Sequence, residues 1–136
     1  MAAPTYFYEL LEQEIASSNR TSSIFSLIRV IFRKANVLDP FESNSVNAAD
    51  ILYFSEALKD VTRKQDCVAR VGINECIILV RANNSNVESL LTRLISSPNL
   101  TVDNSLLIFA AAVEFQEGES ALTLINRLDK VALSTL

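Results

Sequence analysis

The sequence has no histidine and no tryptophan, and its 136 residues include only two cysteines, two glycines and three prolines. Because histidine is missing, Cys67 and Cys76 cannot form a Cys/His zinc site. The shortage of glycine and proline, together with 49% hydrophobic residues, argues against a disordered or loop-rich chain. These counts predict one compact domain that is long enough to bury a substantial core.

Long hydrophobic runs and clusters of basic residues are absent as well. No apolar stretch reaches the about 20 residues that a helix needs to span a bilayer, so we expect no transmembrane segment in this chain. A net charge of -4 without a run of Lys or Arg argues against DNA or RNA as a partner, because phosphate binding needs a clustered basic face. We therefore expect a cytoplasmic domain, either free or as the cytosolic part of a membrane-associated protein, that would hold an anionic ligand with a few placed arginines.

The spacing of apolar residues predicts the order helix, strand, helix, β-hairpin, helix, strand, helix. Helices are expected over residues 5–18 with Thr5 as the N-cap, over 47–63, from a Ser85/Glu88 capping box onward, and over 120–133. Strands are expected over residues 24–32, 67–71, 76–80 and 106–115, and a loop over 39–45. This order is typical of an α/β fold, namely a ferredoxin-like α+β sandwich of the nucleotidyl-cyclase type, in which helices flank a central, mainly antiparallel sheet.

The predicted hairpin contains both cysteines. It would place Cys67 nearer Val80 than Cys76, so we expect both thiols to be reduced, as is usual in the cytoplasm. We expect Cys76 to be a small buried residue.

The segment from Arg63 to Val80, RKQDCVARVGINECIILV, carries a more specific pattern. An R-x-x-D formed by Arg63 and Asp66 is followed by CVARV, by the turn GINEC and by the apolar run IILV. In spacing, without a gap, this segment resembles the signature hairpin of GGDEF domains, the diguanylate cyclases and their inactive relatives. The resemblance implies that residues 1–136 form a single degenerate GGDEF domain and are a fragment of a larger protein.

The residues that family members use for catalysis are replaced. Ile28 and Asn74 stand where the resemblance places the two acidic metal ligands, and Ile73 stands at the second glycine of the turn. An aliphatic side chain cannot coordinate Mg²⁺ and asparagine brings no charge, while Glu75 alone is no two-metal site. The resemblance therefore implies no metal and no cyclase activity. Asn36 matches a guanine-contacting asparagine of the family, and its aspartate partner would fall near Ala48 or Asp50.

What remains is a product-binding pattern. In catalytic members the R-x-x-D is an inhibitory site for cyclic di-GMP, completed by an arginine on the helix after the hairpin, and Arg93 matches that place one residue early. The resemblance implies that Arg63, Asp66 and Arg93 bind cyclic di-GMP. The residue types suit this ligand, because guanidinium groups bind phosphate oxygens and guanine O6 and N7, and a carboxylate accepts from guanine N1 and N2.

A simpler interpretation stays open. Arg63 would merely end its helix, with Asp66 as a turn residue. We expect Arg70 to be a strand residue at the sheet rim, and Arg29 and Arg33 to face solvent or a neighbouring domain.

These observations favour a non-catalytic cyclic di-GMP receptor domain, without cofactor or metal, that regulates a protein partner or a neighbouring domain. By analogy with other uses of such domains, exopolysaccharide and biofilm production is the expected process. The alternative is a ligand-free scaffold for dimerisation or protein–protein interaction.

Overall fold

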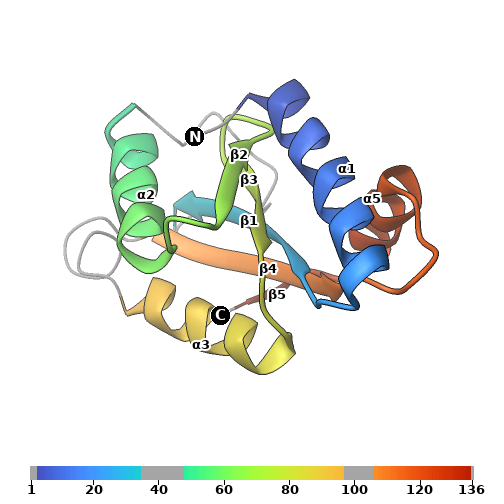
Figure 1. Ribbon diagram of the computed structural model, residues 1–136. Helices are drawn as coiled ribbons and strands as arrows, with labels where there is room; N and C mark the ends of the chain where they lie inside the picture. Colours follow the sequence, from blue (N-terminus) through green and yellow to red (C-terminus); the bar gives the residue numbers. More distant parts are fainter. Residues whose placement is uncertain (1–2, 35–47, 97–105, 136) are drawn as a thin grey trace.

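The computed structural model describes residues 3–34, 48–96 and 106–135, which form an antiparallel sheet with helices on both faces (Figure 1). The sheet has five strands in the order β2-β3-β1-β4-β5. The strands are β1 (Ser26–Lys34), β2 (Cys67–Arg70), β3 (Glu75–Val80), β4 (Leu106–Glu114) and β5 (Ser134–Thr135). The described helices are α1 (Pro4–Thr21), α2 (Ala48–Val61), α3 (Asn84–Ile95) and α5 (Ala121–Lys130). The predicted α+β sandwich and its order of elements are thus confirmed.

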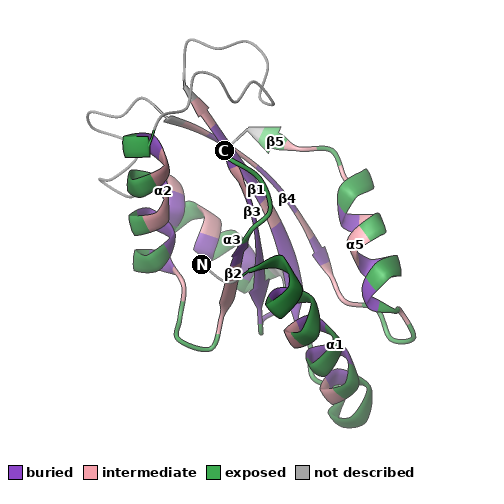
Figure 2. Cartoon of the chain, turned by 90° about the horizontal axis from the view of Figure 1, so that it is seen from above, coloured by how far each residue is buried: buried purple, intermediate pink, exposed green. Residues whose placement is uncertain are grey.

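Strand β1 lies in the middle of the sheet and separates two hydrophobic cores. Its side chains alternate, so that Ile28, Val30 and Phe32 join the core under α2 and α3, while Leu27 joins the core under α1 and α5. The ring of Phe32 stacks on Phe54 of α2 with 4.1 Å between the ring centroids. Figure 2 shows the same arrangement, with buried residues along the central strands and exposed ones on the outer sides of the helices.

The β2–β3 hairpin forms where the sequence predicts it. Cys67 lies opposite Leu79 in the pairing of the two strands, so it does not face Cys76, and both cysteines are free. Cys76 is buried, as predicted, and its burial raises the pKa of the thiol far above the usual value. Arg70 is an exposed strand residue, also as predicted, whose guanidinium donates to the carbonyl of Gly72 at 2.9 Å.

Two predicted helix starts are wrong. Helix α1 begins at Pro4 after Ala3, and Thr5 lies inside the helix, because proline fits the first helical position without loss of a hydrogen bond. Helix α3 begins after Asn83, whose side chain accepts a hydrogen bond from the Asn86 N–H at 3.2 Å. Ser85 is therefore a helical residue and no capping box forms; asparagine is as good an N-cap as serine and lengthens the helix.

The other boundaries differ by a few residues. Strand β1 begins at Ser26, and α5 begins after the N-cap Ser120, whose hydroxyl accepts from the Thr123 N–H at 3.1 Å. Strand β5 was not predicted, since two residues carry no periodic pattern. The predicted loop over residues 39–45 lies outside the described residues. Among the helices that the structure describes, none has both the length and the hydropathy needed to cross a membrane.

The N-cap assignment of α3 is testable with a matched pair of variants. We expect Asn83→Ala to lower the free energy of unfolding by about 1 kcal/mol, because it removes the acceptor for a helix N–H. Ser85→Ala should leave stability unchanged within about 0.5 kcal/mol, since its side chain makes no cap. Urea denaturation of both variants checks this, and an equal loss in both would contradict the assignment.

Candidate ligand-binding site

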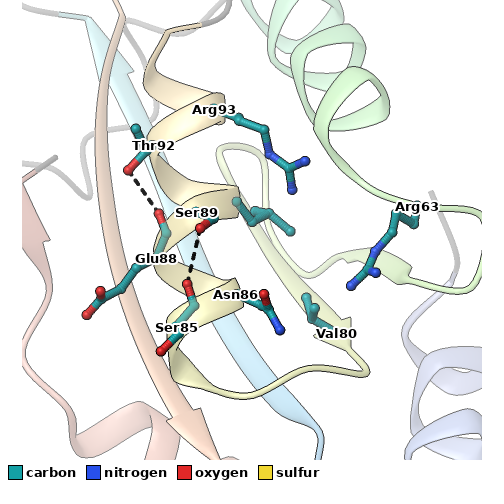
Figure 3. Close-up of a pocket in the computed structure, with 9 residues that line it drawn as sticks. Arg63, Val80, Ser85, Asn86, Glu88, Ser89, Thr92 and Arg93 are labelled. Carbon is teal, nitrogen blue, oxygen red and sulfur yellow. Dashed lines mark hydrogen bonds between the residues drawn. The ribbon is translucent and has the colours of Figure 1, made fainter.

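A hollow of about 550 Å³ opens between α3 and the segment that joins α2 to β2 (Figure 3). Arg63 reaches it from the turn that follows α2, and Asn86 and Arg93 reach it from α3. Buried Val80 and Leu90 also line it and give it an apolar base. We call this region the arginine hollow, because the side chains of Arg63 and Arg93 converge on it from two elements.

Helix α3 places Arg93 through its own packing. Val87, Leu90 and Leu94 are buried against the sheet, which fixes the rotation of the helix about its axis. Asn86 and Arg93 lie about two helical turns apart and therefore share a face, the one that borders the hollow. The Asn86 contribution was missed from the sequence, although its spacing from Arg93 could have indicated it.

The remaining polar side chains of α3 leave the two arginines as the main charged groups of the hollow. The Thr92 hydroxyl donates back to the Glu88 carbonyl at 2.9 Å and the Ser89 hydroxyl to the Ser85 carbonyl at 3.3 Å. Glu88 also lines the hollow, and Figure 3 shows its side chain pointing away from Arg63 and Arg93. Arg93 has no hydrogen-bond or ion-pair partner among the described residues, so its guanidinium donors are available to a ligand.

Arg63 is held by a tight turn over residues 63–66, which we call the Arg63 turn. The Asp66 N–H donates to the Arg63 carbonyl at 3.0 Å, and the Arg63 N–H donates to Asp66 Oδ2 at 2.8 Å. Arg63 Nε lies 3.9 Å from the same carboxylate oxygen, a long contact for an ion pair. The backbone of Arg63 is thus fixed while its side chain, 52% exposed, extends into the hollow.

Asp66 does not share the hollow with the two arginines. Its side chain is only 1% exposed and is engaged with the backbone of Arg63, which is the turn role that the simpler interpretation assigns to it. Its other oxygen, Oδ1, has no hydrogen-bond partner among the described residues. Of the three predicted ligand residues, the structure therefore brings Arg63 and Arg93 together and keeps the Asp66 carboxylate behind the turn.

This arrangement suits a flat or phosphorylated anion. Two guanidinium groups offer forked N–H donors, which bind phosphate oxygens or a pair of acceptors on a nucleobase in two parallel hydrogen bonds. Val80 and Leu90 lie beneath the hollow and keep its base apolar. The hollow is open to solvent on one side, so it can take part of a large ligand.

The hairpin turn, where the sequence resemblance places metal ligands, has other contacts in the structure. Ile28 is fully buried in the core, and the Asn74 amide donates to the Phe32 carbonyl at 2.9 Å while the Phe32 N–H donates to the Asn74 carbonyl at 3.0 Å. Asn74 is therefore used to join the turn to the end of β1. Within the described ranges, no group of three or more His, Cys, Asp or Glu residues is placed to hold a metal ion.

Glu75, the acidic residue of the turn, forms an ion pair with Arg29. Arg29 Nε donates to Glu75 Oε2 at 3.0 Å, and the two side chains are 15% and 24% exposed. The expectation that Arg29 faces solvent or another domain is therefore wrong. Ile31 is the direct partner of Glu75 across the strands, which leaves Arg29 as its diagonal neighbour on the same face. Arg33 likewise packs its guanidinium carbon 5.0 Å from the centre of the Phe109 ring.

The predicted guanine contacts of the catalytic pattern are only partly described. Asn36 lies outside the described residues. Asp50 is buried in the first turn of α2, and Ala48 is the first residue of that helix.

Comparison with known proteins gives the fold. No protein-family model matches the chain, and no curated protein sequence matches it. Solved structures do match: the GGDEF domain of YfiN from Pseudomonas aeruginosa superposes with a TM-score of 0.77 at 14% identity, covering 95% of this chain and 86% of that one. The GGDEF domain of DgcB from Caulobacter crescentus, in complex with cyclic di-GMP, gives 0.79 at 16% identity, covering 95% and 81%.

A third match is the diguanylate cyclase SiaD from P. aeruginosa, in complex with its activator SiaC, with a TM-score of 0.78 at 18% identity. It covers 96% of this chain and 53% of that one. The protein therefore has the fold of a GGDEF domain, as its hairpin sequence led us to expect.

The structural use of Asn74 gives a prediction for the variant that restores an acid to the turn. Asn74→Asp should lower the free energy of unfolding by about 1–3 kcal/mol at neutral pH, because a carboxylate cannot donate to the Phe32 carbonyl. Asn83→Asp is the matched control, since aspartate is an equally good N-cap. Chemical denaturation compares the two; equal stability would mean that the Asn74 amide contributes nothing to the turn.

Proposed function

We propose that this domain is a non-catalytic receptor for cyclic di-GMP. The observation that carries the proposal is the convergence of Arg63 and Arg93, from two different elements, on one open hollow with an apolar base. Cyclic di-GMP presents two phosphates and two guanines, so forked donors over an apolar surface match both its charge and its bases. Asn86 adds an amide on the same side of the hollow.

Asp66 completes the proposed site in a second conformation. In the structure its carboxylate accepts from the Arg63 N–H. On ligand binding we propose that it accepts instead from the N1 and N2 hydrogens of a guanine, which replace that backbone donor. The unpartnered Oδ1 supports this role, because a buried carboxylate oxygen gains from a new donor.

The similar structures support the choice of ligand. DgcB is recorded in complex with cyclic di-GMP, and another match, with a TM-score of 0.74 at 19% identity, concerns an interaction between a microbial GGDEF domain and cyclic di-GMP. Because this chain has the same fold, we propose cyclic di-GMP as the ligand in preference to other anions of similar charge.

The absence of catalysis is part of the proposal. Ile28 is enclosed in the core, Asn74 is bonded to Phe32, and Glu75 is neutralised by Arg29. A two-metal mechanism needs several hard oxygen ligands around both cations. Among the residues that the structure describes, the turn has too few charged oxygens for such a site.

The receptor would act on a protein partner or on a neighbouring domain of a longer protein, in the cytoplasm and without DNA or RNA. The complex of SiaD with its activator SiaC is an example of a protein of this fold that assembles with a regulator. By analogy alone, exopolysaccharide and biofilm production is the proposed process.

A ligand-free scaffold is the second candidate. Val71 and Ile73 are exposed at the tip of the hairpin, which gives a small apolar surface that a protein could cover. Ligand-dependent stabilisation separates the two functions. Cyclic di-GMP at a hundred times its dissociation constant should stabilise a receptor by about 2.7 kcal/mol, whereas a scaffold would show no shift.

Calorimetric titration with cyclic di-GMP tests the site directly. We expect micromolar or tighter binding, and a loss of about 10- to 100-fold in Arg63→Ala and in Arg93→Ala, because each removes charge-assisted hydrogen bonds. Arg63→Lys and Arg93→Lys should recover only part of the affinity, since lysine keeps the charge without the fork.

Arg20→Ala is the control for net charge, because Arg20 is exposed in the last turn of α1 and does not line the hollow. Its affinity should equal that of the unchanged protein. Asp66→Asn tests the carboxylate, since the amide can still accept from the Arg63 N–H but offers one acceptor fewer to guanine. Unchanged affinity in both arginine-to-alanine variants would overturn the proposed site.

The catalytic part is tested by incubating the protein with GTP and Mg²⁺ or Mn²⁺ and separating the nucleotides by chromatography. We expect no cyclic di-GMP, because the turn lacks the acidic ligands that hold the cations. A known active diguanylate cyclase serves as the positive control. Product above the level of a Glu75→Ala variant would show that this chain is an enzyme.

A further inference from the structure

Arg81, the first residue after β3, connects two parts of the molecule that are distant in sequence. Its Nε donates to Glu14 Oε2 of α1 at 2.9 Å, and its Nη1 donates to the carbonyl of Gln65 at 2.6 Å. Arg81 is 46% exposed, whereas the Glu14 side chain is 10% exposed. One guanidinium thus joins α1, the end of β3 and the Arg63 turn.

The hydrogen bond from Arg81 holds the Gln65 carbonyl, a part of the turn that the two bonds of Asp66 do not involve. Asp66 closes the turn at its ends, through the Arg63 carbonyl and the Arg63 N–H. Gln65 lies between those ends, and its carbonyl is bound from outside the turn by Arg81. The turn is therefore held by three hydrogen bonds, of which one comes from a side chain anchored on α1.

We infer that Arg81 is a positioning residue that sets Arg63 for the ligand and links the arginine hollow to α1. This inference rests on the proposed function, since it concerns binding of cyclic di-GMP at that site. Arg81 is not among the residues that line the hollow, so it acts through Gln65 and the turn. The bond from Arg81 to the Gln65 carbonyl and the bond from the Asp66 N–H to the Arg63 carbonyl do not involve the Asp66 carboxylate, so they hold the turn when that carboxylate moves to the ligand. A backbone that is already partly fixed lowers the entropy lost when the ligand immobilises Arg63.

The bond between Arg81 and Glu14 connects the Arg63 turn to α1. Glu14 is a largely buried carboxylate, and its Oε2 accepts a charge-assisted bond from Arg81, so a movement of α1 also moves the donor of the Gln65 carbonyl. By the reciprocity of linked equilibria, a change in α1 that alters ligand affinity is matched by an effect of the ligand on α1. A neighbouring domain attached at α1 would sense the ligand by this route.

Arg81→Ala has a closely matched control in Arg127→Ala. Arg127 also binds one carboxylate and one carbonyl: it donates to Glu119 from Nε at 2.9 Å and from Nη2 at 2.8 Å, and to the Glu114 carbonyl from Nη2 at 2.6 Å, and it does not line the hollow. Arg127→Ala therefore removes the same two kinds of contact as Arg81→Ala, with one hydrogen bond more. Arg81→Lys is the second variant, since a single ammonium keeps the charge and cannot hold both acceptors in the same geometry.

Two measurements are made on these variants of the whole chain. Without ligand, amide hydrogen exchange at Arg63 and Asp66 should be about tenfold faster in Arg81→Ala and unchanged in Arg127→Ala, because only the former loosens the turn. In calorimetry, the dissociation constant for cyclic di-GMP should rise about tenfold in Arg81→Ala, by a smaller factor in Arg81→Lys, and not in Arg127→Ala.

The outcomes separate this inference from the proposed function. If the unchanged protein fails to bind cyclic di-GMP, the receptor function is wrong and Arg81 cannot serve it, whatever the exchange rates. If the unchanged protein binds and Arg81→Ala binds equally well, the receptor stands and the positioning role is overturned. The positioning role is also overturned if amide exchange at the turn changes equally in Arg81→Ala and Arg127→Ala. A general loss of stability would then explain the result.

Discussion

The burial of β1 on both faces and both edges is the constraint on which the structure depends. The strand pairs with β3 on one side and with β4 on the other, and its alternating side chains enter two separate cores. The central part of the strand is mainly apolar, and polar side chains on it have partners, as Ser26 has in the Ala82 carbonyl and Arg29 in Glu75, because an unpaired polar group there would lose its water without compensation. Ile28 is one of the fully buried apolar side chains, and its burial contributes about 1.5–3 kcal/mol to folding.

The arginine hollow follows from that central arrangement. The core under α2 and α3 fixes both helices relative to β3, so Arg63, just after α2, and Arg93 on α3 border the same hollow above Val80. The charged groups stand on backbone that is fixed by packing on one side and by a hydrogen-bonded turn on the other. Long, exposed arginines thus start from well-defined positions, which favours recognition of a rigid ligand.

The sequence predicts the elements well because each has a periodic apolar pattern of sufficient length. It fails where several local solutions are equally good, as at Asn83 and Ser85, and where an element is too short for any period, as in β5. The convergence of Arg63 and Arg93 could be anticipated from the resemblance to a known hairpin. The direction of the Asp66 carboxylate could not, because a turn residue can serve its own backbone or a ligand with the same sequence.

Pairs that depend on strand register were also beyond the sequence. Arg29 and Glu75 are far apart in the chain and meet only because β1 and β3 pair as they do. The same holds for Arg81 and Gln65, where the acceptor is a main-chain carbonyl that no side-chain pattern reveals.

The position of Ile28 limits which substitutions the sheet can accept next to the hairpin turn. Ile28→Asp would place a carboxylate in an apolar core away from water. At the hairpin turn nearby, the Asn74 amide is bonded to Phe32 and Glu75 forms an ion pair with Arg29. Each single step toward a metal-binding turn would cost stability before any cation could compensate for it. Changes at the exposed arginines of the hollow carry no such cost, since Arg63 and Arg93 are not part of the buried core.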